Sequence, residues 1–456
     1  MKKHILALFS ITIAVTATFG QSQKAQCMSN LSMFSEFAKI KNYEAAYEPW
    51  KMVYENCPEL HKATYVYGKR ILEYKISKAS QEDRTTHINQ LLEMYDSGNK
   101  YFPKKYPQGR ITAYKGILSH KENLSSNEEL YNMLNDAFTA DRANFKVPKA
   151  LYLYFSVLVD LHKDGKEDLQ QVFDTYDDVV EKIDTEKSNL VKVINTYIEK
   201  EQAGKLYRKE RQKLKNARSN LQLYRDIAPS IDAKMGTLAD CDKLIPLYEK
   251  NFESKKTDAV WLKRAAGRMN SKDCTDNSLF VTMVGALHEL EPSADSAYYL
   301  GLLNDKSGKN SEAIKYYNEA VALEKDTYKK AKILYKIATK FKNKGQLSNA
   351  RNYAQKALNY QPSMGAAYLL IAKLYEKSAN QCGSTPFEKR AIYWKAAEIA
   401  RKAGKVDTSL KGQANTAVGR YEQLAPDKTM IFNNSMAGKT INFNCWIGGS
   451  VTVPPL

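Results

Sequence analysis

The sequence predicts an all-α fold, a solenoid of helix pairs with long helices in the middle and a short β-rich cap at the C-terminus. Three observations predict it. From Ala294 onwards, small and large residues recur with a period of 34 residues, which is a signature of stacked helix pairs. Residues 168–226 contain no proline and one glycine, so they favour long helices. Residues 428–456 are rich in glycine and in β-branched and aromatic residues, which favours short strands.

Residues 1–20 have the layout of a secretory signal peptide. Lys2 and Lys3 form a basic start, and an uncharged apolar run follows before small residues. The run is about 15 residues long, which is short for a bilayer core about 30 Å thick. We therefore expect export to the periplasm or the outer-membrane periphery, with no transmembrane segment after cleavage; the alternative is an uncleaved anchor. Cys27 does not follow a small-residue stretch, so no lipid anchor is expected.

Residues 21–104 are expected to form N-terminal repeats of paired helices. When these residues are counted in 34-residue units from Cys27, small, large and helix-ending residues fall at the same positions of the unit as they do in the repeats near the C-terminus. The residues that carry this register are Ala46, Trp50, Pro58 and Gly68. Between 105 and 258 the repeats are degenerate, although the apolar spacing still predicts helices.

Residues 168–226 are expected to form long helices that project from the solenoid or brace it. They include the basic run KLYRKERQKLKNAR, from Lys205 to Arg218. Two interpretations of this run are open: solvated charge on ordinary packed helices, or an arm that faces an anionic partner. The acidic pair Asp177-Asp178 is interpreted as solvated charge, because neighbouring residues on a helix point in different directions and make a poor acid–base pair.

Residues 259–427 carry the repeat most clearly. Small residues stand at positions 8, 20 and 27, where two antiparallel helices must approach closely, and large residues fill the remaining space. Glycine near position 15 supports the turn between the helices, and proline at position 32 ends the pair. The residues that carry this register are Gly301, Gly308, Ala313, Tyr317 and Ala320 in one unit, and Ala338, Gly345, Ala350, Ala354, Ala357 and Pro362 in the next.

This register resembles that of the tetratricopeptide repeat (TPR) family. The resemblance implies a TPR-like helical solenoid whose concave surface is lined by first helices and holds a peptide or a helix. A further unit upstream is expected to place its first helix at Ala259–Met269 and its second at Leu279–Glu291. The unit that starts at Gly365 departs from the pattern, because the stretch QCGSTPFEKR lengthens its turn.

Within residues 428–456, short strands are expected at Met430–Asn433, Thr440–Trp446 and Ser450–Val453. Together with the signal-like N-terminus and the TPR units, the segments CTDNSLF, CGSTPFEKRAIYW and CWIGGSVTVP are similar to exported TPR proteins of the Bacteroidota type. This resemblance covers most of the chain, and it implies no particular biochemical activity.

The six cysteines are an even number, which favours disulfides in an oxidising compartment. Six cysteines allow 15 pairings, but the repeat geometry narrows the choice, because the start of a first helix lies near the end of its second helix. By this geometry Cys27 and Cys57 should be neighbours. Cys241 and Cys274 bracket one helical unit, and a bond from Cys382 to Cys445 would join the β-cap to the end of the solenoid, but the sequence leaves the connectivity open. The alternatives are free thiols or a metal site, and the absence of CxxC and of close Cys/His clusters disfavours a metal.

The chain has 69 Lys+Arg and 51 Asp+Glu, a formal net charge of +18. It contains no GxSxG, HExxH, GxxxxGK[ST] or GxGxxG motif and no nucleic-acid-binding signature. We therefore expect no enzyme activity, no cofactor, no metal and no nucleic-acid partner. The excess positive charge suits an anionic envelope material or an acidic protein, or it reflects the general charge of the proteome.

Asp295-Ser296-Ala297 resembles a short acceptor motif for O-glycosylation in Bacteroidota. It also lies where the cap of a helix belongs, and capping is the favoured interpretation.

The TPR resemblance also indicates which side chains face the concave groove, since positions 2, 5, 9, 12 and 13 of a unit usually do. Tyrosine offers a large contact area with a polar tip, and lysine can meet carboxylates on a partner. The expected groove residues are Tyr298, Leu302, Asp305, Lys306, Tyr335, Thr339, Lys342, Leu369, Lys373 and Lys377.

We therefore expect a non-enzymatic protein–protein interaction scaffold of the bacterial cell envelope, with another envelope protein or peptide as partner. The alternatives are a solute- or glycan-binding envelope module, and binding of an anionic envelope polymer through the basic surface.

Overall fold

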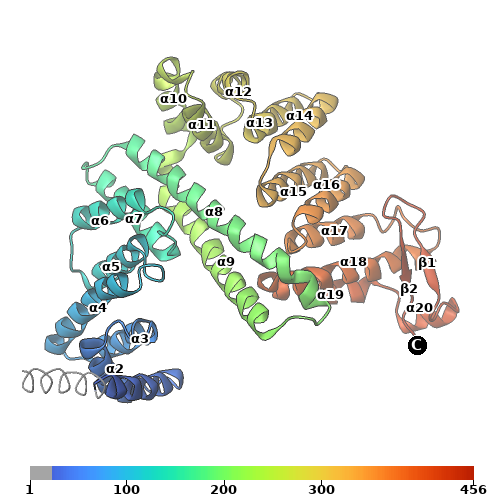
Figure 1. Ribbon diagram of the computed structural model, residues 1–456. Helices are drawn as coiled ribbons and strands as arrows, with labels where there is room; N and C mark the ends of the chain where they lie inside the picture. The colour runs from blue at the N-terminus through green and yellow to red at the C-terminus, as the bar shows by residue number, and fades with distance from the viewer. Residues whose placement is uncertain (1–22) are drawn as a thin grey trace, which may run out of the picture. The chain divides into compact units, whose positions relative to one another are not determined.

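The computed structural model describes residues 23–456, which divide into two compact units (Figure 1). The first unit ends at Val172, and the second runs from Phe173 to Leu456. The expected signal peptide, residues 1–20, lies outside the described residues. Among the helices that the structure describes, none combines the length and the apolar character needed to cross a membrane.

The first unit is a stack of helices in which each helix packs against the next. Its helices are residues 23–39, α2 Tyr43–Asn56, α3 Ala63–Lys78, α4 Gln81–Tyr101, α5 Gln108–Glu122, α6 Asn127–Ala140 and α7 Pro148–Lys163. Local capping defines several of their starts. At α6, for example, Ser126 and Glu129 each accept a hydrogen bond from the other's backbone N–H, at 3.2 and 2.8 Å.

Trp50 on α2 is a large, fully buried side chain in the core of the first unit. It is 1% exposed, and its indole N–H donates to the carbonyl oxygen of Thr64 at 2.7 Å. A methyl group on Gly68 of α3 would lie 2.4 Å from Trp50 Nε1. The large and small residues that the register predicts therefore meet where one repeat unit packs on the next.

The second unit begins with two long helices and continues with helix pairs. The helix α8 Leu169–Gln202 carries the chain from the first unit into the second, and α9 Arg208–Met235 runs back beside it (Figure 1). The later helices are α10 Cys241–Lys255, α11 Ala259–Ser271, α12 Ser278–Leu290, α13 Ala294–Lys306, α14 Asn310–Leu323, α15 Thr327–Asn343, α16 Leu347–Tyr360, α17 Gly365–Lys377, α18 Pro386–Val406 and α19 Lys411–Leu424, with short 3-10 turns at Gly236–Ala239 and Thr408–Leu410.

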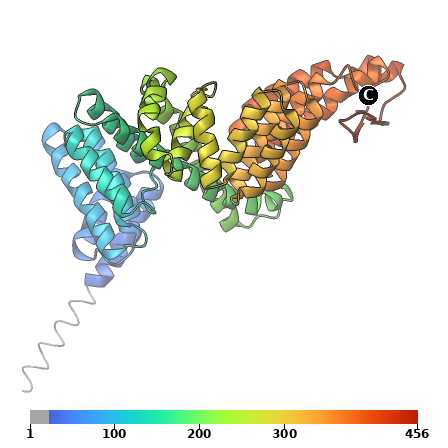
Figure 2. The same cartoon turned by 90° about the horizontal axis from the view of Figure 1, so that it is seen from above.

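The pairs α13–α14 and α15–α16 follow the predicted register, and they stack side by side in the second unit (Figure 2). Gly301 on α13 faces Tyr317 on α14, and a methyl group on Gly301 would lie 2.5 Å from the tyrosine ring. Gly308 and Gly345 turn the chain between the paired helices, each with a φ of 74°, which glycine adopts at little cost. The predicted all-α, TPR-like helical solenoid is confirmed.

The start of α13 contains the Asp295-Ser296-Ala297 motif. Ser293 caps the helix, because its hydroxyl accepts the backbone N–H of Ser296 at 3.2 Å, and the Ser296 hydroxyl accepts the N–H of Ser293 at 2.9 Å. Ser296 is completely buried. The capping interpretation is therefore confirmed, and the buried hydroxyl is not exposed to a glycosylating enzyme.

The six cysteines form three disulfides, in the pairs favoured in the sequence analysis. The pairs are Cys27–Cys57, Cys241–Cys274 and Cys382–Cys445, with Cα–Cα distances of 6.4, 5.5 and 5.5 Å. The first bond joins the first described helix to the end of α2, the second joins the start of α10 to the turn after α11, and the third joins the loop before α18 to the C-terminal segment. Each such bond typically contributes about 2–4 kcal/mol.

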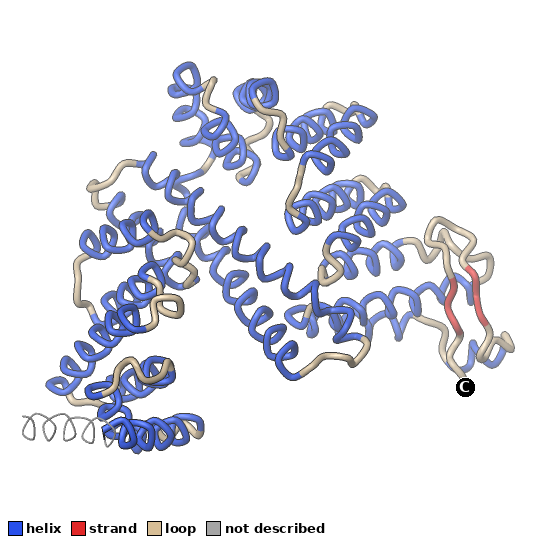
Figure 3. The backbone as a smooth tube through the Cα atoms, viewed as in Figure 1, coloured by secondary structure: helices blue, strands red, loops and turns tan. Residues whose placement is uncertain are grey.

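The C-terminal segment contains less strand than the sequence indicates (Figure 3). Its two strands, β1 Thr440–Asn442 and β2 Ser450–Thr452, pair antiparallel and are shorter than predicted. The strand predicted at Met430–Asn433 is wrong, because these residues belong to the helix α20 Lys428–Asn433. The carboxylate of Asp427 accepts the backbone N–H of Met430 at 2.7 Å, and this cap favours a helical turn.

The α13–α14 contact predicts different outcomes for two glycine-to-alanine substitutions. Gly301→Ala presses a methyl group against the Tyr317 ring and should lower the free energy of unfolding by about 1–3 kcal/mol. Gly419→Ala in α19 meets no atom within 4 Å, so it should be neutral or stabilise by up to about 1 kcal/mol. Thermal and urea unfolding followed by circular dichroism measures both. Equal effects of the two substitutions would contradict the close approach.

Candidate functional site

The first helices of the C-terminal repeats meet α8 along a polar stripe. Residues three or four apart share one side of a helix, and this side of α8 carries Asp177, Glu181, Asp184, Ser188, Lys192 and Asn195. Their hydrogen-bonded contacts are Arg264–Glu181 (3.3 Å), Lys332–Asp184 (3.0 Å), Ser188–Asp326 (2.8 Å), Lys192–Asp326 (2.8 Å) and Ser363–Asn195 (2.7 Å). The long helix therefore braces the solenoid, and it covers part of the surface on which the first helices lie.

Asp177 forms the buried end of this stripe. Its carboxylate lies 3.0 Å from Nη1 of Arg268 on α11. The guanidinium of Arg268 in turn lies over the rings of Phe173 and Tyr248, 4.9 and 5.5 Å from their centres. Burial raises the pKa of Asp177 to about 7, although Arg268 and Arg264 pull it down. The interpretation of Asp177 as solvated charge is wrong, because the docking of α8 on α11 removes the carboxyl group from water.

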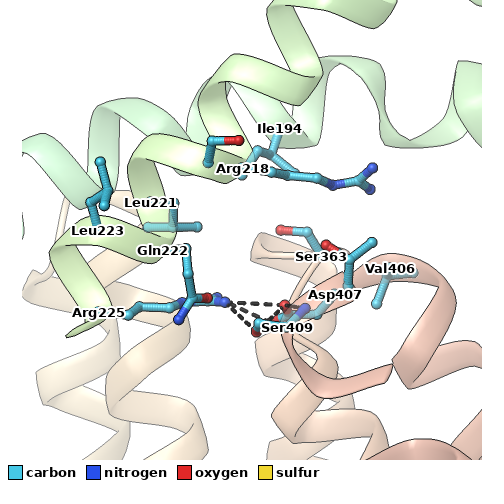
Figure 4. Close-up of a pocket in the computed structure, with 12 residues that line it drawn as sticks. Ile194, Arg218, Leu221, Gln222, Leu223, Arg225, Ser363, Val406, Asp407 and Ser409 are labelled. Atoms are coloured by element: carbon cyan, nitrogen blue, oxygen red, sulfur yellow. Dashed lines mark hydrogen bonds and ion pairs between the residues drawn. The ribbon is translucent and has the colours of Figure 1, made fainter. Parts of the chain in front are cut away.

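A cavity of about 510 Å³ lies between α9 and the turn after α18 (Figure 4). Arg225 donates from both terminal nitrogens to Asp407 at 3.0 Å and also to Ser409 at 2.8 Å. Arg218 donates to both carboxylate oxygens of Glu201, at 2.6 and 2.7 Å. Because each guanidinium is already paired with a carboxylate, this cavity is a seam between α9 and the repeats and offers no open anion site.

Four of the expected groove residues lie on α13 and are engaged within the solenoid. Tyr298 and Leu302 are 7% and 5% exposed, and burial raises the pKa of Tyr298 to about 12. Asp305 pairs with Lys344. Lys306 donates two hydrogen bonds to the turn before α12, at 2.6 and 2.7 Å. Tyr298 and Leu302 leave little contact surface for a partner, and the charged groups of Asp305 and Lys306 are engaged with neighbouring residues, although Lys306 is exposed.

Four other expected groove residues gather around one cavity of about 370 Å³. They are Tyr335, Lys342, Leu369 and Lys373. We call this cavity the C-terminal pocket; its remaining lining residues are Ala366, Leu370, Leu410, Gln413, Ala417, Arg420 and Tyr421. Thr339 instead donates its hydroxyl to the carbonyl oxygen of Tyr335 at 3.0 Å, and Lys377 lies exposed at the end of α17, outside the lining.

The C-terminal pocket combines apolar side chains with cations. Arg420 and the hydroxyl of Tyr421 both donate to the carboxylate of Glu376, at 2.7 and 3.3 Å. Burial raises the pKa of Tyr421 to about 12, so its hydroxyl stays protonated at neutral pH. Lys342 and Lys373, in contrast, have no carboxylate within 4.0 Å in the part of the chain that the structure describes. The pocket therefore presents two uncompensated ammonium groups beside an apolar surface.

The wall of the pocket that α19 supplies was not predicted from the sequence. Gln413, Ala417 and Arg420 are spaced four and three residues apart, so they share one side of that helix. Treating α19 as the first helix of one more repeat would have found this wall. The sequence signal for it is weak, because the lengthened turn before α18 interrupts the 34-residue period.

The 34-residue register and the stacked helix pairs define the chain as a TPR-like helical repeat protein. No family model matches it. Among curated proteins it is similar to photosystem I assembly protein Ycf3. The Ycf3 of Cyanophora paradoxa is 32% identical over 110 residues, which are 22% of this chain and 64%, less than two thirds, of that protein. The Ycf3 of Chlamydomonas reinhardtii is 34% identical over 115 residues, or 24% of this chain and 67% of that protein.

Solved structures similar to this chain are also helical-repeat proteins. A tetratricopeptide repeat protein from Parabacteroides merdae is 11% identical with a TM-score of 0.25, over 68% of this chain and 97% of that one. Yeast Tom70 is 11% identical with a TM-score of 0.24, over 90% of this chain and 99% of that one. Human IFIT1, solved as a dimer with m7Gppp-AAAA, is 15% identical with a TM-score of 0.32, over 81% and 76%.

Asp326 caps α15 and holds α8, so acid should weaken this contact. Burial alone would raise its pKa, but hydrogen bonds from Lys192, the Lys329 backbone and Ser188 lower the pKa of Asp326 to about 2. An aspartate in the unfolded chain titrates at about 4. The ionised carboxylate therefore stabilises the folded unit above that pH, and this contribution is lost as the pH falls from about 4 to about 2.

Asp326→Asn should lower the free energy of unfolding by roughly 1–2 kcal/mol at neutral pH and flatten its dependence on pH in the acidic range. Urea unfolding over a series of pH values measures this. Glu312→Gln, on the exposed side of α14, is the matched control and should follow the parent protein. If Asp326→Asn kept the parent's acid sensitivity, the carboxylate would not be the group that holds α8.

Proposed function

We propose that this chain is a non-enzymatic scaffold that binds a segment of a partner protein in the C-terminal pocket. The observation that carries the proposal is the pair of lysines, Lys342 and Lys373, which lack carboxylate partners and stand beside an apolar surface on successive first helices. No residue of α8 or α9 lines this pocket. In a helical-repeat solenoid the surface of the first helices is the usual place for extended contacts with a partner.

The lining of the pocket indicates the chemistry of the segment it would bind. Leu369 and Leu370 favour an aliphatic or aromatic side chain, since apolar contact removes area from water at about 25 cal/mol per Å². The two lysines favour a carboxylate, but an exposed ion pair contributes only about 0–1 kcal/mol. We therefore assign most of the affinity to the apolar contact. The charges would set the orientation of the bound segment in the pocket.

A location in the cell envelope is part of the same proposal. The signal-like start of the sequence and the three disulfides support it, because disulfides form and persist in oxidising compartments. The partner would then be another envelope protein or peptide. Similarity to Ycf3 extends over about a quarter of the chain and does not indicate the identity of the partner.

Selection from a random peptide library on the oxidised, purified chain tests the proposal. We expect enriched peptides to combine Asp or Glu with Leu, Ile or Phe. Lys342→Glu/Lys373→Glu should weaken the binding of such a peptide by about tenfold or more, which corresponds to about 1.4 kcal/mol. Isothermal titration calorimetry provides the dissociation constants.

Lys315→Glu/Lys356→Glu is the matched control, since it makes the same change of charge at exposed lysines on the second helices α14 and α16. It should bind the peptide like the parent chain. If both double variants lost binding, the loss would result from the change in net charge and not from the two lysines of the pocket. Enrichment of peptides without acidic residues would contradict the assigned chemistry.

A further inference from the structure

We propose that the turn between α8 and α9 is a docking surface for bilayers that contain anionic phospholipids. The surface, which we call the basic tip, consists of Lys205, Tyr207, Arg208, Lys209, Arg211, Lys213 and Lys215. These residues do not line the C-terminal pocket, so this proposal stands apart from the peptide-binding function.

The charge around the tip is strongly one-sided. Residues 200–215 contain seven basic side chains and two acidic ones. Both acids are already paired: Glu201 accepts two hydrogen bonds from Arg218, and Glu210 accepts one from Lys200 at 2.8 Å. The remaining six cations have no carboxylate within 4.0 Å among the described residues. The tip therefore presents uncompensated positive charge to its surroundings.

The fold of the two helices does not require these cations. One side of α9 is buried through Leu214, Ala217 and Leu221, which pack with Val191 and Ile194 of α8. The basic residues of the tip are all exposed on the remaining surface of α9 and on the turn. Like charges placed this close together repel and weaken a helix. A role in binding an anionic surface accounts for a cluster that the packing of the helices does not need.

The tip is the closed end of a helix hairpin, and such an end favours a flat surface as partner. The turn closes the end of the α8–α9 pair that lies away from α10 (Figure 1). Gly204 makes the turn with a φ of 69°. Tyr207 follows at the start of α9 and is 76% exposed. A groove would suit a peptide or a linear polymer better than the end of a hairpin does.

The composition of the tip matches the interfacial region of a membrane. Lysine and arginine near an anionic leaflet are attracted to its headgroups, and tyrosine is enriched where headgroups meet hydrocarbon. The attraction acts over a Debye length of about 10 Å at 0.1 M salt and about 3 Å at 1 M salt. Binding through this tip should therefore need anionic lipid and should be lost at high salt.

Vesicle flotation with the full, oxidised chain tests the proposal. The probes are vesicles of phosphatidylcholine alone and vesicles with about one third phosphatidylglycerol, in 0.1 M and 1 M NaCl. We expect flotation with the anionic vesicles at low salt only. Lys205→Glu/Arg208→Glu/Lys209→Glu should reduce the bound fraction at least tenfold, and circular dichroism checks that this variant stays helical.

Lys309→Glu/Lys315→Glu/Lys356→Glu is the control, with the same change of charge at exposed lysines outside the tip. It should float like the parent chain; an equal loss in this control would overturn the proposal. Tyr207→Ala separates a bilayer from a soluble polyanion such as polyphosphate: it should weaken binding to vesicles and leave binding to polyphosphate unchanged. Tight binding to polyphosphate with no preference for anionic vesicles would also overturn the proposal.

Discussion

The second unit depends on the docking of α8 across the first helices of its repeats. Helices in a solenoid contact only their neighbours, so spacing errors can accumulate along the stack. A single long helix that bonds to α11 through Asp178, to α15 through Asp184 and to the residues before α17 through Asn195 links distant repeats directly. The spacing of α15 and α17, and with it the shape of the C-terminal pocket, is therefore fixed by a helix that does not line that pocket.

This brace combines polar and apolar contacts, and its polar stripe affects what it can do. Its apolar side chains include Val191 and Ile194, which cluster with Tyr328, and Phe173, which packs on Tyr248. Partly exposed ion pairs contribute about 0–1 kcal/mol each, so the stripe adds little stability for its length. The stripe does specify position, because its charges Asp177, Glu181, Asp184 and Lys192 each pair with a residue at one place on the repeats. An interface of this kind resembles contacts between domains more than a hydrophobic core.

The sequence predicts what is local and misses what joins distant segments. The contact of Gly301 with Tyr317 and the disulfide Cys27–Cys57 follow from positions within or between neighbouring helices, and the register gives them. The docking of Arg264 on Asp178 joins residues 86 apart, and nothing local distinguishes an acidic stripe in water from one that faces a repeat. The wrong strand at Met430–Asn433 has a local cause instead, because the cap provided by Asp427 outweighs the preference of β-branched residues for strands.

The excess of basic residues alone would not identify either proposed surface. With 69 basic and 51 acidic residues, the chain carries an excess of 18 positive charges, wherever these residues lie. What distinguishes the C-terminal pocket is that its two unpaired lysines stand beside leucines and tyrosines on first helices. What distinguishes the basic tip is that its cations flank Tyr207 in the sequence, and the aromatic ring of Tyr207 is 76% exposed at the turn between α8 and α9. In both places charged groups and apolar surface occur together, as they do in binding surfaces. The net charge of the chain does not reveal where this combination occurs.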